Sequence, residues 1–190
     1  LFEQSLTEEQ KQLKALVRDF CKREVDQKLM WELAQKAGEV KTIEELRAIQ
    51  PWGLIKKMHE IGLRQLAVPR EYGGGGFTIG HNLTRIMLGE ELGYSGGHAF
   101  ARLLTKDWQT CNVIATPNTT QEQKDWFFPK FMANPTGLCA HVGSEPQGTS
   151  DSMLPYDEPG VALKTLATRD GDGWVTVSYT HLRAHETVLD

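Results

Sequence analysis

Apolar residues recur every third or fourth position over the first two thirds of the chain, a period typical of helices that bury one face. The first predicted helix begins at Thr7, because Thr7 and Gln10 have the spacing of a capping box. Its apolar positions are Leu13, Leu16, Val17 and Phe20. A second helix is predicted between Pro51 and Gly62, which suit the first turn of a helix and the position after its end. Its inward positions are Trp52, Leu54, Ile55 and Met58.

The same period predicts three further helices. The third extends from a cap at Thr78 to Gly93. Its periodic positions are Ile79, Leu83, Ile86, Met87 and Glu90. The periodic positions of the fourth helix are Phe100, Leu104, Trp108, Cys111 and Ala115. The fifth begins at Thr119 or Thr120 and ends near Pro135. The linker through Gly38 has room for another short helix.

The character of the chain changes from Gly137 onward. The β-prone runs are residues 138–142, 161–166 and 174–177, separated by Pro, Gly and Asp. Helices that precede strands without alternation indicate a helical domain followed by the start of a separate β domain. We therefore expect a mainly α chain, with an all-α domain at residues 1–135 and the beginning of a β domain at residues 136–177. Three short strands leave unpaired edges, so we expect further sheet-forming sequence downstream.

Composition places the 190 residues among ordinary folded proteins, with 39% hydrophobic and 24% charged residues. The 21 basic and 25 acidic residues give a net charge of −4, which argues against a general nucleic-acid or anionic-membrane binder. No stretch approaches the roughly 18 apolar residues of a membrane span. The three cysteines, Cys21, Cys111 and Cys139, are far apart, so neither a disulfide framework nor a Cys-rich zinc site is expected. A reducing cytosol or organelle matrix fits this usage.

Two glycine-containing loops are candidates for ligand binding. Residues 68–76 lack the Lys-Ser/Thr of a phosphate loop and the third glycine of a dinucleotide fingerprint, so a tight connection between helices is the better interpretation. Residues 141–151 follow a β-prone run and combine hydroxyl side chains with flexible backbone, which could present several donors to one ligand. An ordinary polar turn is the alternative, and composition alone favours it.

Several motifs occur in a fixed order between residues 5 and 177. The segments are residues 6–10 with 17–20, 68–76 (V-P-x-E-Y-G-G-x-G), 89–93 (E-E-L-G), 120–131 (G-T-x-E-Q-K-x-x-W-L-P-K-L), 144–151 (T-E-P-x-x-G-S-D) and 170–175. Together they resemble the acyl-CoA dehydrogenase family, with a helical bundle followed by a middle-domain β-sheet. The departures are Ser144 in place of Thr, Thr149 in place of Gly, and a longer segment between Asp151 and Thr165.

The resemblance implies FAD as cofactor, bound by the loop after the first β-prone run. The implied cofactor-binding residues are His141, Val142, Gly143, Ser144, Thr149 and Ser150. Ser150 is also the implied substrate contact, with a cap on the turn at Asp151 as its structural alternative. Hydroxyl and N–H donors at this loop would favour negative charge on a reduced flavin. No metal site is expected.

The implied reaction of the intact enzyme is oxidation of an acyl-CoA to the trans-2-enoyl-CoA, with electrons passed to an electron-transfer flavoprotein. In the family the general base is a glutamate in a C-terminal helical domain, so no catalytic residue is assigned among these 190 and the chain alone is expected to be inactive. A homo-oligomer and a location in the bacterial cytoplasm or the mitochondrial matrix are also implied. The alternatives are a flavin monooxygenase or oxidase of the same fold, and a helical partner-binding module without a cofactor.

The family pattern stops abruptly after residue 177. Residues 178–190 resemble the translated read-through of a sequencing adapter, so we expect them to be a non-native tail outside the fold. His181 and His185 with Glu186 have a zinc-like spacing, but they offer no complete ligand set, so a zinc site is not expected.

Overall fold

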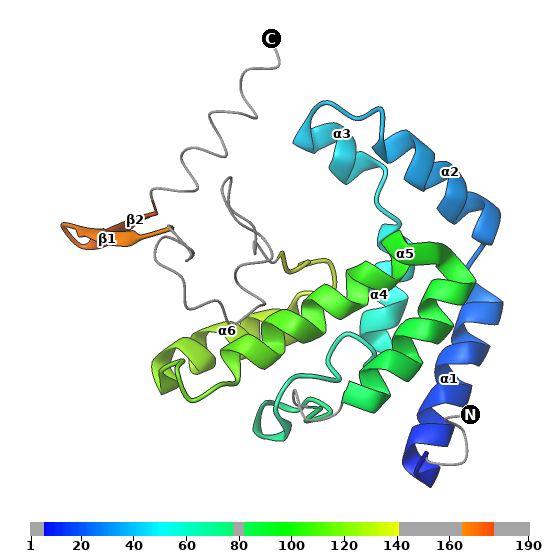
Figure 1. The fold of residues 1–190 in the computed structure, drawn as a ribbon, viewed down its shortest axis with the longest axis horizontal. Helices are drawn as coiled ribbons and strands as arrows, with labels where there is room; N and C mark the ends of the chain where they lie inside the picture. Colours follow the sequence, from blue (N-terminus) through cyan, green and yellow to red (C-terminus); the bar gives the residue numbers. More distant parts are fainter. Residues whose placement is uncertain (1–5, 78–81, 141–164, 177–190) are drawn as a thin grey trace, which may run out of the picture. The chain divides into compact units, whose positions relative to one another are not determined.

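The computed structural model describes residues 6–77, 82–140 and 165–176 (Figure 1). The chain divides into two compact units, Leu1–His141 and Val142–Asp190, and each is described by itself. The elements of the first unit are α1 (Glu8–Glu24), α2 (Gln27–Ala37), α3 (Ile43–Ala48), α4 (Trp52–Glu60), η2 (Arg70–Tyr72), α5 (Asn82–Ile114) and α6 (Gln121–Ala133). Those of the second are β1 (Ala167–Asp170) and β2 (Gly173–Thr176). The predicted mainly α chain with a small β element is confirmed.

Helix starts follow the capping residues. Thr7 Oγ1 accepts the Gln10 N–H at 3.2 Å, and Gln10 Oε1 accepts the Thr7 N–H at 2.9 Å. Thr120 and Gln123 form the same reciprocal pair at the start of α6, so both predicted caps are confirmed. The linker between α1 and α4 contains two helices, α2 and α3, where the sequence indicated room for one.

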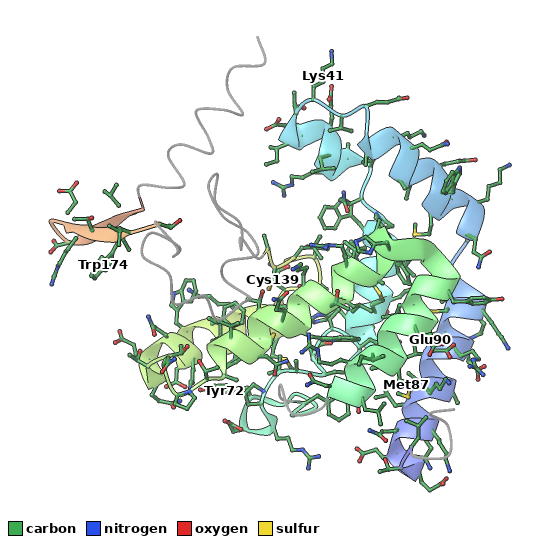
Figure 2. All side chains as sticks on the ribbon, in the orientation of Figure 1. Lys41, Tyr72, Met87, Glu90, Cys139 and Trp174 are labelled. Atoms are coloured by element: carbon green, nitrogen blue, oxygen red, sulfur yellow. The ribbon has the colours of Figure 1, made fainter. Side chains whose placement is uncertain are left out.

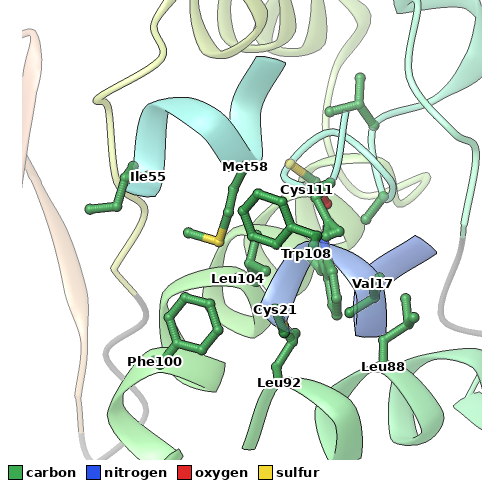
Figure 3. Packing of buried hydrophobic residues seen from close by; sticks show 14 of the residues in the cluster. Val17, Cys21, Ile55, Met58, Leu88, Leu92, Phe100, Leu104, Trp108 and Cys111 are labelled. Atoms are coloured by element: carbon green, nitrogen blue, oxygen red, sulfur yellow. The ribbon is translucent and has the colours of Figure 1, made fainter. Parts of the chain in front are cut away.

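The core lies where α1, α4 and α5 meet (Figure 3). Val17 and Cys21 of α1 and Met58 of α4 pack against α5, each at most 1% exposed. The α5 side chains in this core include Leu88, Leu92, Phe100, Leu104, Trp108 and Cys111. Leu16, predicted to face inward, is 48% exposed, because the buried stripe of α1 is the narrower set Val17, Phe20 and Cys21.

The third and fourth predicted helices are both present; they meet at a kink at Gly97, where the backbone is not helical, and together make up α5. Gly97 has φ +76° and ψ −178°, a region that is essentially restricted to glycine. The inward face before this break differs from the prediction: Ile86 is 68% exposed and Glu90 is exposed, whereas Met87, Leu88 and Glu91 are buried. The cap at Thr78 and the position of Ile79 lie outside the described residues.

The tight connection predicted for residues 68–76 is confirmed and lies within the turns of residues 63–77, which follow α4. The Gly76 N–H donates to Val68 O at 2.8 Å, and the Phe77 N–H donates to Leu66 O at 2.8 Å. A Cβ at Gly74 would lie 2.2 Å from Val68 O, so this close return of the chain requires glycine. The Gly-rich motif therefore has a structural explanation that needs no bound phosphate.

In the second unit, β1 and β2 pair as an antiparallel hairpin in which Asp170 faces Gly173, as the motif at residues 170–175 indicated. Residues 138–140 are not in a strand, which corrects the described part of the first β-prone run. The Cys139 N–H instead donates to Asp107 Oδ1 on α5. Residues 141–142 and 161–164 lie outside the described residues, and residues 165–166 precede β1. No helix in the described ranges has the length and apolar character needed to cross a membrane.

Candidate functional site

The six residues predicted to bind the cofactor all lie outside the described residues. They are His141, Val142, Gly143, Ser144, Thr149 and Ser150. The structure does describe the segment directly before them, residues 134–140, and the side chains that hold it. This approach segment, residues 134–140, connects α6 to the predicted loop.

A buried ion pair lies beside the approach segment. Arg64, in the turn after α4, donates from Nε to Asp107 Oδ2 on α5 at 2.7 Å. The two side chains are 1% and 0% exposed, so the pair is withdrawn from water. Burial of two charges is tolerated only when both are fully hydrogen-bonded, which predicts further partners for each group.

Those partners are backbone groups of the approach segment. Arg64 Nη1 donates to Pro135 O at 2.7 Å, and Nη2 donates to Gly137 O. Asp107 Oδ1 accepts the Cys139 N–H at 3.0 Å. The Arg64 guanidinium also lies 5.3 Å from the centre of the Phe131 ring, a cation–π distance. Arg64 Nη1 also donates to Asn134 O at 3.5 Å. We call Arg64 and Asp107 the anchor, because together they bind the approach segment at four backbone positions.

Two neighbouring hydrogen bonds fix the turn that carries Arg64. Trp108 Nε1 donates to Leu63 O at 2.7 Å, and His59 Nε2 donates to Met132 O at 2.9 Å. Burial lowers the pKa of His59, which favours the neutral imidazole despite the acceptor at Met132. The turn after α4 is thus attached to α5 through Leu63, and the last turn of α4 is attached to the end of α6 through His59.

Burial is the main reason that the two thiols near the anchor are unreactive. Burial raises the pKa of Asp107, while the Arg64 guanidinium and the Cys139 N–H act in the opposite direction by stabilising the carboxylate. Burial and the Asp107 carboxylate raise the pKa of Cys139 to about 12. Burial also raises the pKa of Cys111. Both cysteines are therefore neutral thiols near pH 7 and poor nucleophiles.

A cleft of about 310 Å³ lies between α5 and the approach segment. Its α5 side consists of Ala99, Arg102, Leu103 and Lys106, and its other side is residues 138–140. Cys139, labelled in Figure 2, belongs both to this cleft and to the anchor. The anchor therefore shapes one wall of the cleft.

A smaller apolar pocket of about 90 Å³ shares Ala99 and Leu103 with the cleft. It is lined mainly by apolar side chains of α2 and α5, among them Met30, Leu33 and Phe100. The two cavities thus lie on adjoining faces of the second half of α5. Such an arrangement suits a ligand with a polar or charged end and an apolar body.

The sequence did not single out either anchor residue. Asp107 follows Leu104 by three positions and precedes Cys111 by four, so it lies on the predicted apolar face of its helix. An acidic residue on such a face predicts a buried partner. That signal marks Asp107 as unusual, but it does not identify Arg64, which is 43 residues away.

Residues 6–77 and 82–140 therefore belong to a helical unit whose last helix, α6, is followed by an anchored segment. The family described as "Acyl-CoA dehydrogenase, N-terminal domain" matches residues 7–135. The chain belongs to the acyl-CoA dehydrogenase family, as the motifs indicated.

Individual relatives agree over most of this chain. It is 31% identical over 171 residues to the probable acyl-CoA dehydrogenase YngJ of Bacillus subtilis. The matched residues cover 90% of this chain and 38% of that protein. It is 30% identical over 170 residues to cyclohex-1-ene-1-carbonyl-CoA dehydrogenase of Syntrophus aciditrophicus, covering 90% and 35%. Acryloyl-CoA reductase (NADH) of Anaerotignum propionicum is 31% identical over 166 residues, covering 87% and 36%. The chain spans somewhat more than a third of the length of these relatives.

Proposed function

We propose that this chain is the N-terminal part of an FAD-dependent acyl-CoA dehydrogenase that converts an acyl-CoA to the trans-2-enoyl-CoA. The observation that carries the proposal is the family match over residues 7–135, supported by relatives named for CoA thioester substrates. Within it, residues 1–135 are the helical domain, residues 136–177 begin the middle β domain, and residues 178–190 are a non-native tail. In the whole enzyme, an electron-transfer flavoprotein accepts the electrons, the subunits form a homo-oligomer, and the location is cytoplasmic.

The proposed cofactor contacts are those of the loop after the approach segment. Backbone groups at His141, Val142 and Gly143 and the hydroxyls of Ser144, Thr149 and Ser150 hold the flavin, and Ser150 also contacts the thioester. FAD, when bound there, supplies the acceptor for the hydride that leaves the β-carbon. The contribution of the described residues is positional, because Arg64 and Asp107 fix the backbone from which the loop departs.

The test is a hybrid in which residues 6–177 of this chain replace the matching part of the Bacillus subtilis relative. We expect a folded protein with visible flavin absorbance that bleaches when an acyl-CoA is added under anaerobic conditions. The 190-residue chain serves as the control and should purify without flavin, since it spans a minor part of its relatives. A hybrid with a cooperative thermal transition but no flavin at saturating FAD would contradict the proposal.

The role of Ser150 is tested in the same hybrid. Replacing Ser150 with Ala removes one hydroxyl, and if that hydroxyl bonds a charged group the loss is about 1.5–3 kcal/mol in FAD affinity or in kcat/KM. A hydroxyl that only caps the turn would instead cost about 1 kcal/mol of stability. Ser152→Ala is the matched control. Unchanged affinity and kinetics with a lowered melting temperature would remove Ser150 from the site.

A further inference from the structure

His59 attaches the last turn of α4 to the end of α6 through one ring nitrogen. Its Nε2 lies 2.9 Å from Met132 O, and because a carbonyl oxygen can only accept, the neutral ring carries its proton on Nε2. The other ring nitrogen, Nδ1, is enclosed by protein atoms and has no hydrogen-bond partner among the residues that the structure describes. A second proton on Nδ1 would therefore be a buried donor without an acceptor.

The charges around the ring also oppose a second proton. Two buried charges act on it, Arg64 on the turn after α4 and Asp107 on α5. Asp107 is already bonded by Arg64 and by the Cys139 N–H, so the buried charges balance only while the ring is neutral. From α4 itself, Glu60 acts on the ring, but it is exposed, and water weakens its attraction for an imidazolium. The contact from α6 is a backbone carbonyl.

His59 and Arg64 bind neighbouring parts of one stretch of backbone. His59 binds the carbonyl of Met132 in the last turn of α6, and Arg64 binds three carbonyls between residues 134 and 137. The approach segment begins two residues after Met132. Loss of the His59 contact would therefore free the backbone directly before the residues that Arg64 holds.

We propose that the contact between His59 and Met132 is a pH switch: the neutral ring attaches the end of α6 to α4, and protonation of Nδ1 from solvent releases the contact and loosens the approach segment. Burial and the Arg64 charge hold the pKa of His59 below its ordinary value of 6.5, although the Met132 carbonyl and Asp107 act in the opposite direction. The stabilisation by the neutral ring is therefore complete above pH 6.5 and decreases as the pH falls from 6.5 towards the lowered pKa.

NMR of the 190-residue chain tests the switch in two steps. The ring resonances of His59 report its tautomer and its titration, and we expect a proton on Nε2 at pH 7 and a midpoint below 6.5. Hydrogen exchange then reports release at the amides of Asn134 and Cys139, both of which are hydrogen-bonded in the structure. Between pH 7 and pH 5.5 their protection factors should fall severalfold, while those of the interior amides of α1 stay constant.

Two histidine variants make the test specific. His59→Gln keeps an amide donor for Met132 O but cannot be protonated in this range, so its protection factors should not change between pH 7 and pH 5.5. His98→Gln removes an exposed histidine of α5 and should behave as the wild type does. Because the titration of His59 is measured in the wild type, the inference is tested even if His59→Gln does not fold.

Four results would overturn the inference. A midpoint at or above 6.5, or a neutral ring with its proton on Nδ1, would show that the fold does not favour the neutral Nε2 form of His59. Constant protection factors in the wild type between pH 7 and pH 5.5 would show that protonation does not release the contact. An equal fall in His59→Gln would assign the pH dependence to another group, such as Asp107.

Discussion

The two halves of α5, before and after Gly97, use the same kind of contact for different purposes. In the first half, Glu91 accepts from Arg18 of α1, with Arg18 Nη2 at 2.6 Å. In the second half, Asp107 accepts from Arg64 at 2.7 Å. The Arg18 side chain is 47% exposed, whereas the Arg64 side chain is 1% exposed. Water competes for the first pair and not for the second, so similar distances correspond to very different energetic consequences.

The two ion pairs also connect different parts of the chain. Glu91 connects two helices whose packing is already provided by apolar side chains such as Val17 and Leu92. Asp107 and Arg64 bind backbone that has no regular secondary structure to hold it, at Pro135, Gly137 and Cys139. A buried pair of this kind specifies the position of a connecting segment, which an apolar contact of equal size would leave less defined.

The largest effect is expected from breaking the anchor. Arg64→Met leaves the Asp107 carboxylate buried without its counter-charge, and we expect a loss of about 3–5 kcal/mol in the free energy of unfolding. Arg64→Met/Asp107→Leu removes both charges and should be less destabilised than the single variant. Chemical denaturation measures both. A single variant that loses less than about 1 kcal/mol would mean that the pair is not effectively buried.

The junction between the two halves is tested by alanine at two glycines of α5. Gly97→Ala forces a side chain into a glycine-only backbone region, and we expect a loss of about 1–3 kcal/mol. Gly89→Ala is the matched control, because a Cβ there meets no neighbouring atom and its backbone is helical, so a gain of about 0.5–1 kcal/mol is expected. Equal effects of the two substitutions on thermal unfolding would show that α5 has no break at Gly97.

A smaller effect is expected at the first half of α5. Glu91→Gln weakens the bond to Arg18, and because Arg18 is half exposed we expect a loss of about 1 kcal/mol or less. The hydrogen bond from Arg18 holds the pKa of Glu91 below its ordinary value of 4.5. The stabilisation is therefore present above pH 4.5 and is lost as the pH falls through the lowered pKa.

Unfolding of the wild type and of Glu91→Gln between pH 7 and pH 3 measures this dependence. The difference between the two proteins should shrink as the solution becomes acidic. A difference in stability that grows on acidification would contradict the lowered pKa of Glu91.

The smallest effect is expected from residues outside both halves. Removal of residues 178–190 should change the free energy of unfolding of the helical unit by less than about 0.5 kcal/mol, because the non-native tail that we propose for this segment would have no selected packing partners. Thermal melts of the two forms provide the comparison. A loss of more than about 2 kcal/mol would show that this segment contributes to the fold.

Local features of this fold were predictable from the sequence, whereas long-range pairs were not. The caps at Thr7 and Thr120 depend on residues three positions apart, and the turn of residues 63–77 depends on its glycines. The buried face of α5 was misassigned at Ile86, which is exposed, and at Glu91, which is buried and accepts a hydrogen bond from Arg18, 73 residues away. The spacing of apolar residues along α5 does not reveal this distant partner.

The candidate site also combines residues that the sequence identified with residues that only the fold revealed. The cofactor-loop residues came from the family motifs, and no property of the described residues locates them. Asp107 is unusual in the sequence as an acidic residue on an apolar helix face, but its partner Arg64 became apparent only when the fold brought the two together. Arg102 and Lys106 likewise form a pair only once residues 138–140 complete the opposite wall of the cleft.

The central claim is that the anchor fixes the approach segment, and amide hydrogen exchange at Cys139 tests it most directly. The Cys139 N–H donates to Asp107 Oδ1, so it should be protected in the wild type, roughly to the level of local opening of a folded region. In Arg64→Met/Asp107→Leu this amide should exchange much faster, while the interior amides of α6 remain protected. Equal exchange at Cys139 in both proteins would contradict the claim.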